Sequence, residues 1–133
     1  MTGIRILLIE DNSGDAQLLS EQLEELGVDW TVQRVARVST ALTALADEPF
    51  DLVLMDLGLP DSNGIETLRR IREFKPDLPV VVLSGSSQEG LAEETAREGA
   101  RTMLVKGRIE PTLLLRAVEC AINNDCNGNE EGG

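Results

Sequence analysis

The chain of 133 residues contains no histidine. This absence excludes a Ser-His-Asp triad, a zinc site with histidine ligands and a phosphohistidine on this chain. Any histidine chemistry in which the protein takes part must therefore come from another protein.

Basic residues and long apolar runs are also scarce. Twelve Lys and Arg stand against 24 Asp and Glu, which gives a formal net charge of −12. This balance argues against direct binding of nucleic acid or an anionic membrane, and it favours a cation or a basic face on a partner protein. No stretch approaches the roughly 20 apolar residues of a membrane span, and the opening MTGIRILLIEDN runs into acidic residues rather than a cleavage site. We therefore expect a cytoplasmic protein with no membrane contact.

The length suffices for one compact domain and is too short for two. Apolar residues make up 41% of the chain and charged residues 27%, as in ordinary globular proteins. The end of the chain, NNDCNGNEEGG, is polar and rich in glycine. We expect residues 1–123 to form the domain and residues 124–133 to form a polar tail or the start of a linker.

The central feature of the sequence is the segment 50–64, FDLVLMDLGLPDSNG. Its apolar run at 52–55 is typical of a strand that is buried on both faces, and the glycines, proline and small polar residues after it form turns. Asp56 therefore lies where a strand ends, on the edge of a parallel sheet where ligands bind.

Five apolar or alternating segments predict strands, and a helical pattern follows each of them. The strands are predicted at 4–9, 30–35, 52–55, 80–83 and 102–105. The helices are predicted at 16–26, from Ser39 as a cap to 46, at 65–71, at about 88–98, and at 111–122. This alternation predicts an α/β fold with a doubly wound parallel sheet and helices on both faces. Periodicity alone does not give the strand order.

Polar residues follow four of the five predicted strands. Because parallel strands end at one edge of the sheet, we expect these side chains to converge there. They are Glu10, Asp11, Asp56, Ser84 and Lys106. Three converging carboxylates repel one another unless a cation lies between them. Magnesium fits this set best, because it prefers oxygen ligands and is commonly held by carboxylates together with a phosphate oxygen.

These residue types also suit phosphoryl transfer. With a metal ion to neutralise an incoming phosphoryl group, the Asp56 carboxylate can attack phosphorus in line and form an acyl phosphate. Lys106 supplies a positive charge for the phosphoryl oxygens, and Ser84 supplies a hydroxyl donor.

The same motifs resemble those of a known family. They are the acidic pair at 10–11, the DLVLMD block at 51–56 with Pro60 and Gly64 after it, the Ser84-Gly85 step and the GARTMLVK block at 99–106. Each is weak alone, but at these spacings together they resemble the receiver (CheY-like) domain of two-component response regulators. The resemblance covers about residues 4–122.

The resemblance implies a flavodoxin-like fold with strand order 2-1-3-4-5. It implies that Asp56 accepts a phosphoryl group from a sensor histidine kinase or a phosphotransfer protein, and that the chain catalyses only its own phosphorylation and hydrolysis. It further implies roles for the other site residues: Asp11, Asp56 and the Gly58 carbonyl as magnesium ligands, Glu10 helping through water, and Ser84 and Lys106 binding the phosphoryl group.

Two positions depart from the family pattern. Met103 stands where an aromatic residue is usual, so we expect the coupling from Ser84 to the output surface to be looser or differently built. Gly107 stands where the family usually has a cis-proline. Because a cis peptide before a non-proline residue costs about 3 kcal/mol, we expect a trans bond there.

Three other classes of protein compete with the receiver. A hydrolase with an aspartyl nucleophile would usually carry a second acid at the position of Gly58. A dinucleotide-binding domain would need a glycine-rich turn where this chain has EDNSGD, which repels phosphate. The closest alternative is a receiver-like docking module that works without phosphorylation. Met103 and Gly107 favour it, and the intact set of site residues argues against it.

The expected partners follow from the resemblance. An output domain or a downstream protein would bind the face formed by the segments at 88–98, 102–105 and 111–122. The acidic segment at 88–98 is compatible with either a homodimer face or a docking face. The sequence identifies neither the kinase nor the output.

Overall fold

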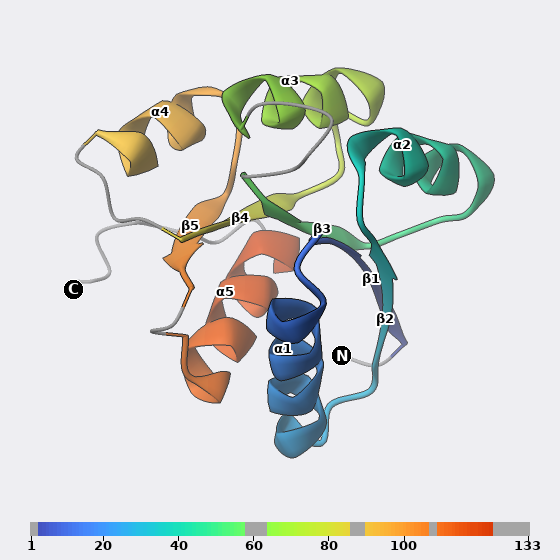
Figure 1. Ribbon diagram of the computed structural model, residues 1–133, viewed down its shortest axis with the longest axis vertical. Helices are drawn as coiled ribbons and strands as arrows, with labels where there is room; N and C mark the ends of the chain where they lie inside the picture. The colour runs from blue at the N-terminus through green and yellow to red at the C-terminus, as the bar shows by residue number, and fades with distance from the viewer. Residues whose placement is uncertain (1–2, 58–63, 86–89, 107–108, 124–133) are drawn as a thin grey trace.

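The computed structural model describes residues 3–57, 64–85, 90–106 and 109–123, and it alternates strictly between strand and helix (Figure 1). The elements in chain order are β1 (Ile4–Ile9), α1 (Ser13–Leu26), β2 (Trp30–Val35), α2 (Val38–Asp47), β3 (Leu52–Asp56), α3 (Gly64–Phe74), β4 (Val80–Ser84), α4 (Leu91–Arg97), β5 (Thr102–Val105) and α5 (Pro111–Asn123). This order confirms the five predicted repeats of strand and helix.

The five strands form one parallel sheet in the order β2-β1-β3-β4-β5. Helices α1 and α5 cover one face of this sheet, and α2, α3 and α4 cover the other (Figure 1). The strand order confirms the flavodoxin-like fold that the resemblance implied. It also places β1, β3, β4 and β5 side by side, so that their carboxyl ends share one edge.

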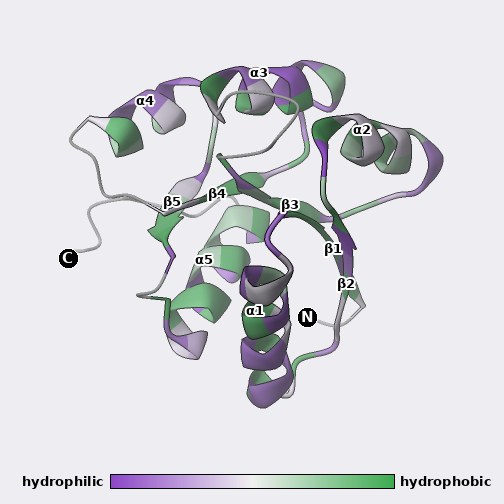
Figure 2. Cartoon of the chain, in the orientation of Figure 1, coloured by the Kyte–Doolittle hydropathy of each residue, from purple (hydrophilic) through white to green (hydrophobic). Residues whose placement is uncertain are grey.

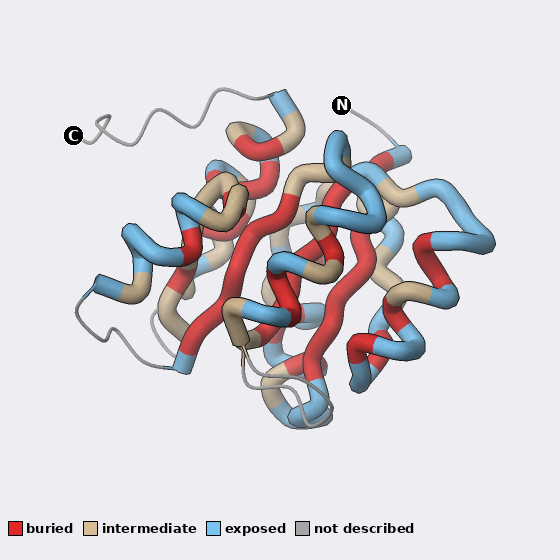
Figure 3. Tube along the Cα trace, turned by 90° about the horizontal axis from the view of Figure 1, so that it is seen from above, coloured by how far each residue is buried: buried red, intermediate tan, exposed pale blue. Residues whose placement is uncertain are grey.

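The core consists of two apolar clusters, one on each face of the sheet. Alternate strand residues supply them: Leu8 and Leu54 join α1 and α5, whereas Leu7 and Val53 join α2 and α3. Because helices cover both faces, every residue of β3 and β4 is buried. Figure 2 shows these central strands mainly in the hydrophobic colour, and Figure 3 shows them as nearly continuous buried segments. The sheet edge that carries the polar residues therefore stands on a rigid base.

Two helix starts differ from the prediction. Helix α2 begins at Val38 after an extended Arg37 that makes no side-chain cap, so the expected cap at Ser39 was wrong. Helix α1 begins at Ser13, and the Asn12 side chain caps it by accepting a hydrogen bond of 2.9 Å from the Asp15 N–H. The first turn of α1 thus begins four residues after the end of β1, which brings Asp15 close to the sheet edge.

Helix α4 is the shortest helix, with seven residues that begin after Gly90. Part of its predicted range, residues 88 and 89, and the predicted tail at 124–133 lie outside the described residues. Among the helices of the described ranges, none is long and apolar enough to cross a membrane.

Candidate functional site

The predicted polar residues lie at the carboxyl edge of the sheet. Glu10 follows β1, Asp56 ends β3, Ser84 ends β4 and Lys106 follows β5. The backbone joins these ends: the Lys106 N–H donates a hydrogen bond of 2.8 Å to the Ser84 carbonyl, and the Leu57 N–H donates one of 3.2 Å to the Leu83 carbonyl. The sheet therefore fixes the spacing of the four strand ends.

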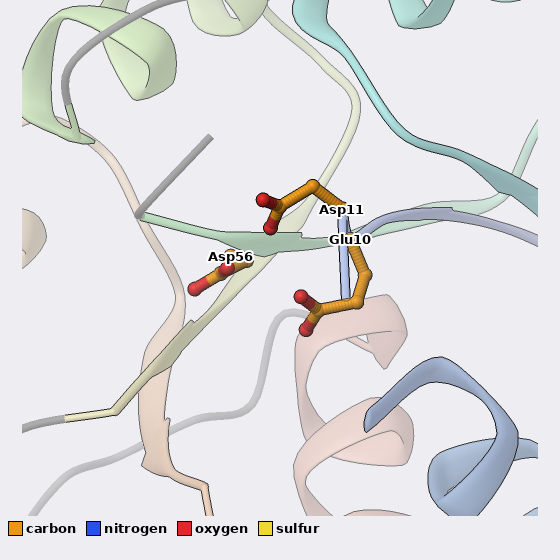
Figure 4. Close-up of side chains that lie close together, drawn as sticks. All are labelled: Glu10, Asp11 and Asp56. Atoms are coloured by element: carbon orange, nitrogen blue, oxygen red, sulfur yellow. The ribbon is translucent and has the colours of Figure 1, made fainter. Parts of the chain in front are cut away.

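Three carboxylates form the centre of the site. Glu10, Asp11 and Asp56 each place a carboxylate oxygen within 4.8 Å of the other two (Figure 4). Glu10 and Asp56 are only 1% and 7% exposed, whereas Asp11 faces solvent. The structure thus brings together the acidic residues that the sequence analysis selected, with one open side.

The Lys106 side chain crosses from β5 to these acids. Its Nζ lies 2.6 Å from Glu10 Oε1, 3.2 Å from Asp56 Oδ2 and 3.1 Å from Asp15 Oδ2. Only 19% of the Lys106 side chain is exposed, and its contacts with the buried Glu10 and Asp56 are shielded from water, whereas Asp15 is partly exposed. Lys106 neutralises part of the acidic charge, and Asp11 is not among its ion-pair partners in the described part of the chain.

These contacts shift two ionisation equilibria. Burial acts to lower the pKa of Lys106, but its hydrogen bonds with Glu10 and Asp15 outweigh that effect and hold the pKa above its ordinary value. Burial raises the pKa of Glu10, opposed by its hydrogen bonds from Lys106 and from the Asn12 N–H. Lys106 is therefore positively charged at neutral pH, and it compensates the charge of the buried Glu10 carboxylate.

The remaining predicted site residues divide into two groups. Ser84 is 4% exposed and lies on the strand next to β3, and Met103 is half-buried on β5, where it packs against the apolar cluster beneath α2 and α3. Gly58, expected to supply a carbonyl ligand, and Gly107, expected to follow a trans peptide, both lie outside the described residues.

One contact was not anticipated from the sequence. Asp15 is an acid of the first turn of α1, and it is absent from the group of three carboxylates. Its ion pair with Lys106 joins residues 91 positions apart. The only sequence signal was the capping residue Asn12 right after the acidic pair, which starts α1 at the sheet edge.

The donor set fits a hard divalent cation. It offers three carboxylates on one edge, one of them open to solvent, and no described residue forms an ion pair with Asp11. Hard oxygen donors of this kind suit magnesium, which retains several of its own water ligands. The same edge holds an ammonium group against Asp56, so it can bind a metal ion and an anion side by side.

Known proteins show close similarity to this chain. A family model for the response regulator receiver domain matches residues 6–119. The cell cycle transcriptional regulator CtrA of Caulobacter vibrioides is 36% identical over 103 residues, which are 77% of this chain and 44% of CtrA. The sensor kinase/phosphatase LuxQ of Vibrio vulnificus is 36% identical over 107 residues, which are 78% of this chain and 12% of LuxQ. The chain thus corresponds to less than half the length of either relative.

A solved structure also matches nearly all of the fold. The receiver domain of a sensor histidine kinase from Pseudomonas aeruginosa PAO1 is 27% identical, with a TM-score of 0.78 over 92% of this chain and 99% of that one. That structure holds a magnesium ion coordinated in its active-site cleft.

Proposed function

Because this chain belongs to the response regulator receiver domain family, we propose that it accepts a phosphoryl group on Asp56 from a partner histidine kinase or phosphotransfer protein. The observation that carries the proposal is the double contact of Asp56. Its carboxylate belongs to the group of three acids and also lies 3.2 Å from the Lys106 ammonium. A nucleophile in this position has a cation site on one side and a fixed positive charge on the other.

The reaction transfers a phosphoryl group from a histidine of the partner to the carboxylate of Asp56. An Asp56 carboxylate oxygen forms a bond to phosphorus, and the bond from phosphorus to the partner's histidine nitrogen breaks with its electron pair left on the imidazole. With a small donor such as acetyl phosphate, the broken bond is the phosphorus–oxygen bond, and acetate leaves with the electron pair. Hydrolysis of the acyl phosphate returns Asp56 to its starting state.

Glu10, Asp11 and Asp56 would hold Mg²⁺, with the Gly58 carbonyl as a further ligand and Glu10 acting through water. When bound, Mg²⁺ would offset the negative charge of the phosphoryl oxygens. The chain's own part is to fix the three carboxylates at the ends of β1 and β3, so that little reorganisation is needed when the donor arrives.

Lys106 and Ser84 would bind the phosphoryl group. Lys106 is held against Asp56 by its buried ion pair with Glu10, which keeps the ammonium in place and charged. Ser84 ends the strand next to Asp56 and provides a hydroxyl donor. These roles suit a phosphoacceptor that catalyses only its own phosphorylation and hydrolysis, with no outside substrate.

The consequence of phosphorylation would be a change in binding at the face formed by α4, β5 and α5. Met103, which is half-buried on β5, would couple the phosphorylation site to the face formed by α4, β5 and α5, in place of an aromatic residue. The partner would be an output domain or a separate downstream protein, and a homodimer through this face is a second form of the same switch. Residues 1–123 would form the receiver, with 124–133 as a tail or linker.

The test is intact mass spectrometry after incubation with acetyl phosphate, with and without Mg²⁺, on the wild type and on Asp56→Asn. We expect the mass of one phosphoryl group to be added only when Mg²⁺ and Asp56 are both present. A folded wild type that gains no phosphoryl group under any condition would overturn this function in favour of a docking module that works without phosphorylation.

A further inference from the structure

The Lys106 ammonium has three acidic partners in the unphosphorylated protein. An ammonium group has three N–H donors, and carboxylate oxygens of Glu10, Asp15 and Asp56 lie at 2.6, 3.1 and 3.2 Å from Nζ. These three contacts can therefore engage every donor of the group. A new anion at Asp56 can bind Lys106 only if one of these contacts is given up.

Burial decides which contact is released at the lowest cost. The Glu10 side chain is 2% exposed, and its other oxygen accepts a hydrogen bond from the Asn12 N–H, so an unpaired Glu10 would be left buried. Asp56 carries the phosphoryl group itself. The Asp15 side chain is 45% exposed, so water can replace Lys106 as its partner.

The surroundings of Asp15 also leave it room to move away. A cavity of about 130 Å³ lies beside the ion pair. It is lined by Glu10, Asp15 and Lys106, by further polar and apolar side chains of α1, and by Leu83 and Ile109. Asp15 stands in the first turn of α1, where the N-terminal N–H groups favour a carboxylate without any help from Lys106. The released side chain therefore remains in a favourable environment.

From these contacts we propose that Asp15 is a positioning residue that occupies, in the unphosphorylated protein, the Lys106 donor needed by the incoming phosphoryl group. The proposal rests on the proposed function of Asp56. It assigns Asp15 a restraining role: its contact with Lys106 must break as the oxygen–phosphorus bond forms and the donor's leaving group departs. This contact slows phosphorylation and stabilises the unphosphorylated state.

The test compares phosphorylation rates with acetyl phosphate at saturating Mg²⁺ for the wild type and Asp15→Asn. We expect Asp15→Asn to react faster, by about threefold at low ionic strength, because the lost interaction is a partly exposed ion pair. Glu21→Gln is the matched control: it removes one negative charge from an exposed position on the same helix, and the rate should stay at the wild-type value.

Two further measurements separate the role of Lys106 from a general charge effect. In a Lys106→Met background, adding Asp15→Asn should leave the rate nearly unchanged, because Asp15 would act through Lys106. In the absence of Mg²⁺ and donor, NMR of the Lys106 ammonium should show faster proton exchange with water in Asp15→Asn than in the wild type, because one donor is freed.

The outcomes distinguish this inference from the function on which it rests. A wild type that takes up no phosphoryl group contradicts the proposed function. If the wild type is phosphorylated at a rate equal to or higher than that of Asp15→Asn, only the role of Asp15 is overturned. An equal gain from Asp15→Asn in the Lys106→Met background would also overturn it, because the effect would then be bulk charge.

Discussion

Asp11 differs from the other two acids of the site in its charge balance. Glu10 and Asp56 both contact the Lys106 ammonium, whereas Asp11 is exposed, forms no ion pair with a described residue, and lies within 4.8 Å of the two neighbouring carboxylates. Like charges at this distance raise the free energy of the folded state by about 1 kcal/mol in a well-hydrated setting. Without a cation, Asp11 should therefore reduce stability rather than add to it.

The corresponding variant is Asp11→Asn. In the absence of Mg²⁺ we expect it to raise the free energy of unfolding by about 1 kcal/mol, because a repulsion is removed. Adding Mg²⁺ at about 100 times its dissociation constant should stabilise the wild type by about 2.7 kcal/mol and the variant by much less. Urea denaturation followed by far-UV circular dichroism, with and without Mg²⁺, measures both effects.

Asp77→Asn is the control for this experiment. It removes an exposed charge from the loop between α3 and β4, at the opposite edge of the sheet, and should keep the full stabilisation by Mg²⁺. An Asp11→Asn variant that is less stable than the wild type without Mg²⁺ would contradict the repulsion. One that Mg²⁺ stabilises as much as the wild type would show that Asp11 is not part of a cation site.

The residues of the site could largely be located from the sequence because strand ends are local features. Apolar runs that stop at a polar residue placed Glu10, Asp56, Ser84 and Lys106 on one edge, and the structure brings them to that edge. The ion pair of Asp15 could not be predicted in the same way. It depends on the angle at which α1 leaves β1 and on the reach of the Lys106 side chain, and neither follows from periodicity.

At the scale of elements, the turn between α4 and β5 is built around Gly99. This residue has a φ of +102°, and its N–H donates to the Ala96 carbonyl to close α4. A Cβ at this position would overlap Arg72 Nε, near the end of a flexible side chain that comes across from α3 and also donates to the Pro76 carbonyl. Gly99 therefore permits both the turn and the close packing of α3 against it.

We expect Gly99→Ala to lower the free energy of unfolding by about 2 kcal/mol, because a φ of +102° is strained for alanine and the flexible Arg72 side chain must also shift. Gly27→Ala is the matched control. Gly27 also has a positive φ, of 65°, but a Cβ there meets nothing within 4 Å, so only the conformational cost of about 1 kcal/mol should appear. Thermal or urea denaturation of both variants measures the difference.

The contact with Arg72 can be isolated by a double variant. Adding Arg72→Ala to Gly99→Ala should recover part of the loss beyond that of Arg72→Ala alone, because the overlapping side chain is gone. Equal losses for Gly99→Ala and Gly27→Ala would contradict the role of the packing contact.

The elements themselves were predicted well where their signal is continuous. The predicted ranges at 4–9, 30–35 and 102–105 coincide with β1, β2 and β5. The error at α2 has a local cause. Ser39 is a typical capping residue, but the helix begins one residue earlier, after an extended Arg37 whose side chain makes no capping hydrogen bond. Capping preferences describe averages, and backbone geometry alone can start a helix.

For the whole molecule, the strand order could not be derived from periodicity. Every strand is parallel and flanked by helices, so many orders satisfy the same local patterns. The order β2-β1-β3-β4-β5 came from the family resemblance, which the structure confirms. The strand order matters for function because it places β1 and β3 as neighbours and thereby joins their terminal acids.

Because the chain has few other groups that titrate at alkaline pH, the ionisation of Lys106 should affect the measured stability of the whole protein. The sequence has no histidine, no tyrosine and only two lysines, Lys75 and Lys106, so few side chains titrate between neutral and strongly alkaline pH. The contacts with Glu10 and Asp15 hold the pKa of Lys106 above its ordinary value of 10.5, despite the opposing effect of burial. Folding therefore favours the protonated form of this lysine.

The pH dependence of stability follows from that shift. For a group whose pKa is raised on folding, the stabilisation is fully present below the pKa of the unfolded chain, about 10.4 for lysine, and is lost as pH rises through the pKa of the folded protein. Without Mg²⁺, the free energy of unfolding of the wild type should thus decline above about pH 10.4. The decline should be smaller in Lys106→Met and should persist in Lys75→Met, where Lys106 remains. Urea denaturation over this range measures the slopes, and equal slopes in the wild type and Lys106→Met would mean that the acids around Lys106 do not hold its proton.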